Sequence, residues 1–343
     1  MDVNKIIQSL ANTAESKIVV FGDYALDKYL YIDPERDEPS AETGMPAYQV
    51  HRKFLAAGVG GTITNNLRAL GAQVTCIGIL GDDGEGFELL RELQKIGADT
   101  SKMVKVDSMC TSTYTKPMRK GADGVYREMN RLDFRNFSEP PAKAQEEVLA
   151  NLKEVLPNVQ AVLITDQFYQ RNMGVVTDYV RDELANLAKE NPDKIFYADS
   201  RSFMEEFHNM IVKCNNLELF SKFSGGEGNP EDLDEILAKG QEVYVKNGDP
   251  LFVTRGADGI VVFGEEVEKV PAFKVEGEID ICGAGDATNA GIVLGLTLGL
   301  SMAEAALLGC CVSSITIQQI GTTGTASVAK VKERLSGVAL CQN

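Results

Sequence analysis

The fold is decided by a short stretch near the start of the chain, residues 17–22, which has the sequence KIVVFG. A run of apolar, mostly β-branched residues that ends at glycine predicts a buried strand of a parallel sheet. Similar runs follow at residues 74–78, 159–165, 195–198, 211–214 and 251–254. Segments with the apolar spacing of amphipathic helices lie between these runs, at residues 62–70, 85–96, 142–156, 175–189 and 231–245. The alternation predicts a doubly wound α/β fold, with a mostly parallel central sheet between two layers of helices.

Two segments interrupt this alternation, residues 30–56 and 111–134. Both combine β-branched and aromatic residues with polar neighbours, and the second has a turn at residues 121–124. This pattern favours strands that are exposed on one face, such as a small β-sheet lid that projects from the main domain. Flexible surface hairpins fit the pattern equally well. We therefore expect one domain over residues 1–343, with two inserted segments.

The end of the chain predicts two consecutive helices. Residues 281–300 form its most apolar part, but this part carries Asp286 and Asn289, which favours a buried helix and its entry loop over a membrane span. Ser301 and Glu304, three positions apart, have the pattern of a capping box that opens a second helix.

The composition excludes several classes of function. The chain has 34 Lys and Arg against 50 Asp and Glu, and the net charge of −16 disfavours binding to nucleic acid or to an anionic membrane. Two distant histidines and seven cysteines without a C-x-x-C pair argue against a structural zinc site. The N-terminus lacks the pattern of a secretory signal, so we expect a cytoplasmic protein.

The sharpest chemical signal is the stretch Gly283-Ala284-Gly285-Asp286, which precedes the apolar helix. Small residues leave the N–H groups of a helix N-terminus uncovered, and such a terminus can bind a phosphoryl group. An aspartate at the same end could take the proton of a substrate hydroxyl while the amides stabilise charge on the transferred phosphate. The alternative is an ordinary N-capping aspartate behind a glycine turn.

Four separated motifs together resemble the PfkB, or ribokinase-like, family of sugar kinases. They are Gly22-Asp23 with Asp27, the sequence AGVGGT at residues 57–62, the sequence NNLE at residues 215–218, and residues 280–286. The resemblance implies a ribokinase-like fold and the ATP-dependent phosphorylation of a sugar hydroxyl. It implies that Asp286 is the catalytic base and that the anion hole consists of Gly283, Ala284 and Gly285.

The same resemblance assigns the binding residues. The sugar would contact Asp27, Gly58, Gly60, Gly61 and Thr62. ATP would lie beside the loop TRGADG at residues 254–259, at Thr254, Gly256 and Gly259, and near Asn215. Asn215 and Glu218 would act on Mg²⁺ through water, since magnesium keeps most of its hydration shell. Asp199 and Arg201 resemble an aspartate and an arginine near the family's site, a monovalent cation could bind near Asp280, and related enzymes often form dimers through the lid.

Within the family, three shorter motifs resemble the heptose 7-phosphate kinases: GDYALDKY at residues 22–29, RLDF at residues 131–134, and Gly321-Thr322. The nucleotidyl-transferring domain that is often fused to those kinases is not expected in 343 residues, which implies a stand-alone kinase. A phosphorylated sugar needs cationic partners. The lid segments supply Arg119 and Arg127, our candidates for this role, together with Arg52, Lys53, Lys116 and Lys120. The alternative is that these are solvated charges of surface hairpins.

One departure from the family motif leaves the identity of the sugar undetermined. Thr62 stands where the first signature of the family has an asparagine that contacts the sugar, and a threonine has a shorter reach and fewer donors. The substrate could therefore be a heptose phosphate or another hexose, a pentose or a nucleoside. A non-catalytic sugar- or nucleotide-binding protein on the same fold is the hypothesis from another class.

The sequence has no G-x-x-x-x-G-K-[ST] motif and no G-x-G-x-x-G after the first strand, which disfavours a P-loop kinase and a dinucleotide-binding dehydrogenase.

Overall fold

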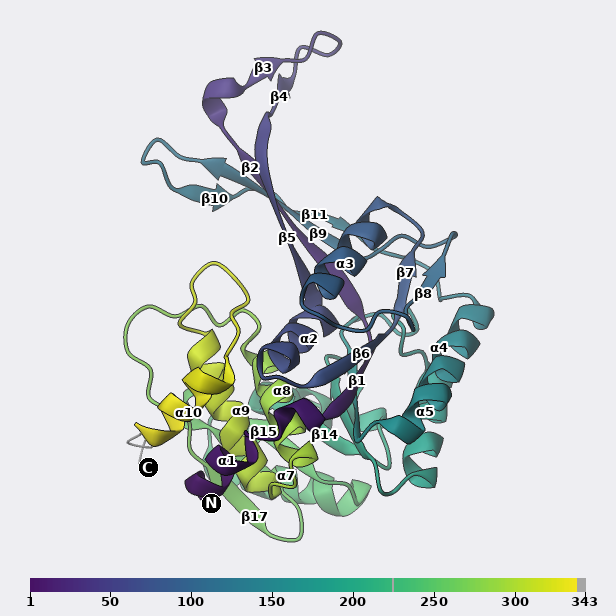
Figure 1. The fold of residues 1–343 in the computed structure, drawn as a ribbon, viewed down its shortest axis with the longest axis vertical. Helices are drawn as coiled ribbons and strands as arrows, with labels where there is room; N and C mark the ends of the chain where they lie inside the picture. The colour runs from purple at the N-terminus through teal and green to yellow at the C-terminus, as the bar shows by residue number, and fades with distance from the viewer. Residues whose placement is uncertain (224, 338–343) are drawn as a thin grey trace.

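The computed structural model describes residues 1–223 and 225–337 of the chain, which form a body and a projecting lid (Figure 1). A sheet of eight strands forms the centre of the body, in the order β17-β16-β15-β14-β13-β12-β1-β6. Its strands are β1 (Lys17–Gly22), β6 (Gln73–Ile77), β12 (Ala161–Asp166), β13 (Ile195–Ser200), β14 (Ile211–Asn215), β15 (Leu251–Thr254), β16 (Ile260–Phe263) and β17 (Val267–Val270). All six strands expected from the sequence are present and parallel, while β16 and β17 extend the sheet in antiparallel pairing. The predicted α/β fold is confirmed.

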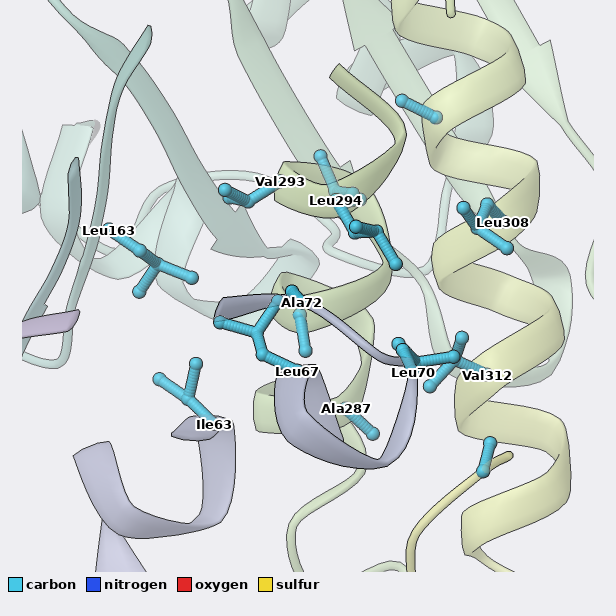
Figure 2. Close-up of a cluster of buried hydrophobic side chains, with 14 of the residues drawn as sticks. Ile63, Leu67, Leu70, Ala72, Leu163, Ala287, Val293, Leu294, Leu308 and Val312 are labelled. Carbon is cyan, nitrogen blue, oxygen red and sulfur yellow. The ribbon is translucent and has the colours of Figure 1, made fainter. Parts of the chain in front are cut away.

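Helices cover both faces of this sheet, because side chains alternate between two cores along each strand. In β1, Ile18 and Val20 belong to one core, while Val19 and Phe21 belong to the other. The described helices are α1 (Val3–Ser9), α2 (Gly60–Ala69), α3 (Gly84–Lys95), α4 (Ala142–Val155), α5 (Asp178–Glu190), α6 (Asn216–Phe223), α7 (Leu233–Asn247), α8 (Ala284–Thr297), α9 (Met302–Thr316) and α10 (Val328–Ser336). Figure 2 shows the first core, where side chains of α2 lie close to those of α8 and α9. This packing fixes the starts of α2 and α8 relative to the sheet.

The lid is a second, smaller sheet that stands away from the body (Figure 1). Its strands are β2 (Tyr24–Ile32), β5 (Val50–Val59), β9 (Thr113–Lys120), β10 (Tyr126–Glu128) and β11 (Leu132–Phe134), and the short strands β3 (Glu38–Pro39) and β4 (Pro46–Ala47) form its tip. The strands β7 (Ile79–Gly81) and β8 (Val104–Val106) pair separately. The first lid strand begins at Tyr24, six residues before the inserted segment expected at residue 30. Asp27 therefore belongs to the lid rather than to the body.

The helices at the end of the chain follow the expected pattern. The Ser301 hydroxyl accepts a hydrogen bond from the Glu304 N–H at 3.2 Å, and the Glu304 carboxylate accepts one from the Ser301 N–H at 2.9 Å. This is the predicted capping box at the start of α9. Within residues 1–223 and 225–337, none of the helices is both long and apolar enough to span a bilayer. The sequence did not predict α1, α6 and α10, because helices of 7, 8 and 9 residues carry too few apolar repeats.

Candidate active site

A cavity of about 500 Å³ lies between the lid and the carboxyl ends of the central strands. The lid contributes Asp27 from β2 and Lys116 from β9. The body contributes Asp199 from β13, Lys213 from β14 and Asp286 from α8. Parallel strands that end at the same edge deliver side chains from distant parts of the sequence to one place.

Helix α8 begins at the wall of this cavity. Its N-cap residue Gly283 has the left-handed conformation, with φ of 78°, and no side chain of the described residues caps the helix. A glycine adopts this conformation without strain. The following residues Ala284 and Gly285 also line the cavity. The Ala284 N–H donates to the carbonyl oxygen of Ile281 at 3.1 Å, while the Gly285 N–H belongs to the first turn, where a helix offers no internal partner. The four residues of the predicted anion hole and base are thus brought together, and the terminus can bind a phosphoryl group.

Asp286 lies in the first turn of α8 and lines the cavity. Burial raises the pKa of Asp286 to about 7, and the nearby charge of Asp199 adds to the rise, while Lys213 and Arg201 oppose it. A base with a pKa near neutral pH has a strong affinity for the proton of a hydroxyl and is still ionised in a large fraction of molecules. The environment of Asp286 is therefore suited to general-base catalysis.

Lys213 is a part of the site that the sequence analysis missed. Its side chain is held by Asp199, with 3.3 Å between the Lys213 Nζ and the Asp199 Oδ1. The other Asp199 oxygen accepts a hydrogen bond from Asn289 at 2.6 Å, and Asn289 accepts one from the Tyr197 hydroxyl at 2.9 Å. Burial lowers the pKa of Lys213, but the nearby acidic groups, chiefly Asp199 and Glu218, together outweigh this effect, so the pKa lies above its ordinary value and the amine stays charged.

The position of Lys213 relates it to the anion hole. A Cβ atom built on Gly285 would lie 3.7 Å from the Lys213 Nζ, so the ammonium group lies next to the first turn of α8. A phosphoryl group at this turn would meet the backbone N–H groups and the lysine together. The signal in the sequence was a lysine inside the apolar strand IVKCN, since a buried lysine is rare unless it has a partner.

Part of the set predicted to bind the sugar lines the cavity. Asp27 and Thr62 line the cavity, and the Asp27 carboxylate accepts a hydrogen bond from Lys116 at 2.8 Å. Gly60 and Gly61 are buried in the first turn of α2 and are not among the residues that line the cavity. Gly58 acts indirectly, because a Cβ atom there would lie 2.5 Å from the Asp27 Oδ2.

We expect the substitution Gly58→Ala to weaken sugar binding, because its methyl group must displace the Asp27 carboxylate. The KM for the sugar should rise by about tenfold or more, with a smaller effect on the KM for ATP. Gly84→Ala is a matched control, since a Cβ atom there would have no heavy atom of the described chain within 4 Å. Steady-state kinetics of both variants test this prediction, and an unchanged KM for the sugar in Gly58→Ala would contradict it.

The structure does not bring the two predicted lid arginines to the cavity. Arg119 pairs with Asp37 and lies 4.6 Å over the ring of Tyr48. Arg127 pairs with Asp123 in the turn between β9 and β10. Both arginines have partners within the lid, in agreement with the alternative that such charges belong to surface hairpins. The sequence pattern could not show which lid residues face the body.

Other cationic side chains line the cavity in their place. They are Lys116, Arg131, Arg135 and Arg201, in addition to Lys213. Arg131 and Arg135 both pair with Asp133, and Arg201 lies 5.2 Å over the ring of Tyr169. The Arg135 Nε is buried and has no hydrogen-bond partner among the residues that the structure describes. This edge of the cavity is therefore suited to an anionic group of a substrate.

A second cavity of about 390 Å³ adjoins the first. Thr254, Gly256 and Gly259, which were predicted to contact ATP, all line it, opposite Ser313 and Ser314 of α9. Its other walls are largely apolar, with Ile260, Phe273, Val275, Ile279 and Ile317. Apolar walls with a few polar groups are typical of a site for a nucleotide base. Ile281, Ala284 and Gly285 line both cavities, so the two meet at the start of α8.

Asn215 and Glu218 have a defined structural role at the start of α6. The Asn215 Oδ1 accepts a hydrogen bond from the Glu218 N–H, and the Glu218 Oε2 accepts one from the Asn215 N–H, both at 2.8 Å. Glu218 also lines the first cavity, and burial raises its pKa. Asn215 is not among the residues that line either cavity. It acts on the site by fixing the position of Glu218.

Glu218 fits the predicted magnesium site as a single carboxylate. In the described part of the chain, no three His, Cys, Asp or Glu side chains gather in the manner of a protein-only metal site. Mg²⁺ does not need such a group, because it is commonly held by one or two carboxylates, water and the phosphates of a nucleotide.

Asp280 accepts hydrogen bonds from the N–H groups of Cys282 at 3.0 Å and Gly321 at 3.0 Å, so it connects two loops of the site. The monovalent cation near Asp280 stays a prediction.

The model of the pfkB family of carbohydrate kinases matches residues 15–329. The chain belongs to this family. It is 26% identical over 328 residues to the bifunctional protein HldE of Wolinella succinogenes, which covers 95% of this chain and 66% of that protein. It is 28% identical over 327 residues to the protein of the same name from Trichlorobacter lovleyi, which covers 93% of this chain and 63% of that protein. The chain thus spans less than two thirds of the length of these relatives.

Solved structures confirm the ribokinase-like fold. The ribokinase of Arabidopsis thaliana complexed with ribose and ATP superposes with a TM-score of 0.69 at 17% identity, over 94% of this chain and 99% of that chain. The ribokinase of Thermotoga maritima gives a TM-score of 0.63 at 18% identity, over 94% of this chain and 99% of that chain. The family match thus shows a member of the pfkB carbohydrate kinases, and the solved structures show the predicted fold.

Proposed function

We propose that the protein transfers the γ-phosphate of ATP to a hydroxyl group of a sugar, and that this sugar already carries a phosphate. One observation carries the proposal: Asp286 and the uncovered first turn of α8 lie where two cavities meet. The cavity lined by Thr254 and Ser313 has the chemistry of a nucleotide site. The cavity lined by Asp27 and Arg201 has the chemistry of a site for an anionic sugar.

The chemical step follows from this arrangement. Asp27 and Thr62 orient the sugar so that one hydroxyl group faces Asp286, which accepts the proton as the oxygen attacks the γ-phosphorus. The bond between the γ-phosphorus and the bridging oxygen of ATP breaks, and ADP and a doubly phosphorylated sugar are formed. The N–H groups of α8 and the Lys213 ammonium group stabilise the negative charge of the transferred phosphoryl group. Mg²⁺ beside Glu218 supplies further charge neutralisation on the ATP phosphates when it is bound.

The lid serves this reaction by covering the sugar, which excludes water and protects ATP from hydrolysis. The lid also carries exposed apolar side chains, namely Tyr48, Val50, Phe54, Leu132 and Phe134. An apolar surface of this kind favours contact with another protein surface. We include a homodimer through the lid in the proposal, together with a location in the cytoplasm, where ATP is available.

The positive charges at the cavity edge support the proposal that the sugar already carries a phosphate. In a chain with a net charge of −16, Arg131, Arg135 and Arg201 gather around one opening. The relatives in the comparison are bifunctional HldE proteins, and three motifs of the sequence resemble heptose 7-phosphate kinases. A heptose phosphate is therefore the substrate that we propose, and other phosphorylated hexoses or pentoses belong to the same chemical class.

A panel of free and phosphorylated sugars tests this function through the release of ADP from Mg-ATP. We expect phosphorylated sugars to stimulate release and the matching free sugars to have little effect. Arg201→Met should raise the KM for the phosphorylated sugar by about tenfold or more, because a charge-assisted hydrogen bond is lost. Arg127→Met is the matched control, since Arg127 pairs with Asp123 outside the cavity. A preference for free sugars would contradict the anionic substrate, and no release with any sugar would favour a non-catalytic binding protein.

A further inference from the structure

Asp23 lies between β1 and the lid strand β2, and only 2% of its surface is exposed. It is not among the residues that line the substrate cavity within the described chain. Its N–H donates to the carbonyl oxygen of Thr165 at 2.9 Å, and its own carbonyl oxygen accepts a hydrogen bond from the Gly60 N–H at 3.0 Å. Gly60 opens α2, whose first turn carries Thr62. The backbone of Asp23 thus joins the end of β12 to one wall of the cavity.

The Asp23 carboxylate holds both ends of a loop that forms another part of the cavity wall. Its Oδ2 accepts a hydrogen bond from the Gln167 N–H and its Oδ1 accepts one from the Val175 N–H, both at 2.8 Å. Gln167 and Tyr169 of this loop line the cavity. A Cβ atom on Gly174 would lie 2.7 Å from the Asp23 Oδ1, so the loop closes over the carboxylate only with a glycine there.

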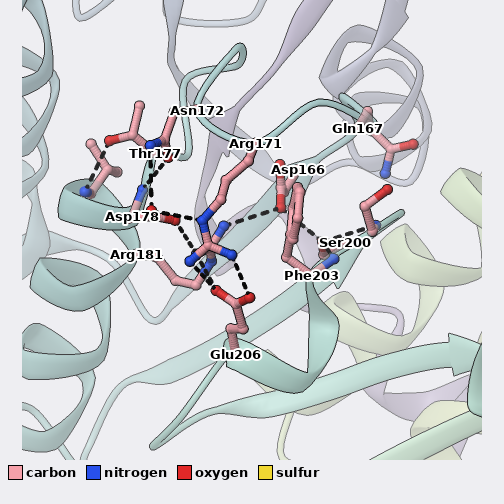
Figure 3. A network of polar contacts seen from close by, with 12 residues as sticks. Asp166, Gln167, Arg171, Asn172, Thr177, Asp178, Arg181, Ser200, Phe203 and Glu206 are labelled. Atoms are coloured by element: carbon pink, nitrogen blue, oxygen red, sulfur yellow. Dashed lines mark hydrogen bonds and ion pairs between the residues drawn. The ribbon is translucent and has the colours of Figure 1, made fainter. Parts of the chain in front are cut away.

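The outer side of the same loop is fixed by a network of ion pairs (Figure 3). Arg171 donates to Asp178 of α5 and to Glu206, each at 2.8 Å. Arg181, which is 2% exposed, donates to the same two carboxylates at 3.0 and 2.8 Å. The loop is therefore held from the outside by charges and from the inside by Asp23.

The neighbouring strand end carries the arginine of the cavity edge. Asp166 accepts a hydrogen bond from the Ser200 hydroxyl at 2.7 Å, and its carbonyl oxygen accepts one from the Arg201 N–H at 2.9 Å. Arg201 lies over the ring of Tyr169, which belongs to the loop that Asp23 holds. The position of this loop therefore also affects where the Arg201 guanidinium group lies.

We propose that Asp23 is a positioning residue for sugar recognition, which acts by fixing the loop of Gln167 and Tyr169 on one side of the sugar and the start of α2 on the other. The inference rests on the proposed function, because it assigns the first cavity to the sugar. The residues that Asp23 positions line this cavity, and none of them lines the nucleotide cavity among the described residues. Asp23 should therefore affect the sugar far more than ATP.

Burial of the carboxyl group agrees with this role. Burial raises the pKa of Asp23 to about 6, and the hydrogen bonds from the Val175 and Gln167 N–H groups oppose the rise. The loop thus stabilises the ionised form, which accepts hydrogen bonds on both oxygens. An asparagine at this position has the same shape, but its amide nitrogen cannot accept one of the two N–H groups.

Two variants test the inference from opposite sides of the same contact. Asp23→Asn removes one acceptor, and Gly174→Ala inserts a methyl group against the carboxylate without changing any charge. In each variant the KM for the sugar should rise by about tenfold or more, while the KM for ATP changes by less than about twofold. Amide hydrogen exchange should become faster at Gln167 and Val175 in both variants, which reports the loss of the loop contact independently of turnover.

Glu304→Gln is the matched control. Glu304 is also buried, and its carboxylate also accepts hydrogen bonds from backbone N–H groups. It lies in the first turn of α9 and is not among the residues that line either cavity. This variant should lower the Tm without changing the ratio of the two KM values. Equal changes in both KM values, or an unchanged sugar KM in a folded Gly174→Ala variant, would overturn the inference. If the wild type shows no sugar-dependent ADP release, the proposed function fails. In that case the exchange rates at Gln167 and Val175 still decide whether Asp23 holds the loop.

Discussion

Replacing Asp286 with asparagine is expected to reduce kcat by about 10²- to 10⁴-fold, since an asparagine cannot accept the proton of the sugar hydroxyl. The substitution keeps the shape of the side chain in the first turn of α8, so ATP and the sugar should still bind. Steady-state kinetics with Mg-ATP and a phosphorylated sugar measure this effect. Asp182→Asn provides a matched change at an exposed position of α5. A loss of less than about tenfold in Asp286→Asn would contradict the role of general base.

The same variant should be more stable than the wild type at neutral and alkaline pH. Burial holds the pKa of Asp286 at about 7 in the folded protein, well above the ordinary value of an aspartate. Folding therefore favours the protonated carboxyl, and the wild type loses stability as the pH rises from about 4 to about 7. Asparagine has no such loss. The Tm of Asp286→Asn should exceed that of the wild type at about pH 8, and the difference should disappear towards about pH 4.

The second large effect is expected at Lys213. Replacement by methionine removes the ammonium group beside the first turn of α8 and should reduce kcat by about 10²- to 10³-fold, as is typical for one group that stabilises transition-state charge. It should also change the pH dependence, because Lys213 lowers the pKa of Asp286. The acid limb of kcat/KM, which should lie near pH 7 in the wild type, should move to higher pH in Lys213→Met.

Asp199→Asn is expected to shift the acid limb of kcat/KM in the opposite direction. Asp199 raises the pKa of Asp286 through its negative charge, so its removal should move the acid limb of kcat/KM to lower pH. Rate profiles of both variants against pH compare the two shifts directly. Shifts in the same direction, or an acid limb that stays in place in both variants, would contradict the assignment of this limb to Asp286.

Much of the fold could be predicted from the sequence because the body obeys simple patterns. The apolar run of residues 17–22 forms β1 with the expected bounds, and the capping pair Ser301 and Glu304 opens α9. Buried parallel strands are apolar on both faces, and they are therefore easy to find in a sequence. The antiparallel strands β16 and β17 have only four residues each and were not expected as separate elements.

The site could be predicted only where motifs are contiguous. Residues 283–286 form the expected helix start because a glycine turn followed by a short polar residue determines its own geometry. Lys213 and Arg135 reach the cavity through the register of strands and the path of a loop, which single-sequence patterns do not specify. Arg119 and Arg127 were predicted to bind the substrate, but β9 and its turn direct both side chains to partners in the lid. Of the arginines that line the cavity, Arg131 lies in the same segment, while Arg135 and Arg201 lie outside it.

The role of Asp23 could not be predicted from the sequence either. In the sequence it is adjacent to Gly22 and belongs to the motif that also contains Asp27. Two nearby aspartates carry no local signal of which one faces a substrate. The structure separates them, because Asp27 lies in a lid strand at the cavity while Asp23 is buried beneath the loop of Gln167.

The central claim is that Asp286 activates a sugar hydroxyl for attack on ATP, and one measurement tests it most directly. Phosphorus NMR can follow Mg-ATP and a panel of phosphorylated sugars with the wild type and with Asp286→Asn at about pH 8, above the pKa of the base. The account predicts that ADP and a doubly phosphorylated sugar accumulate together with the wild type, and that neither accumulates at a comparable rate with the variant. Equal rates of sugar phosphorylation in the two proteins would contradict it.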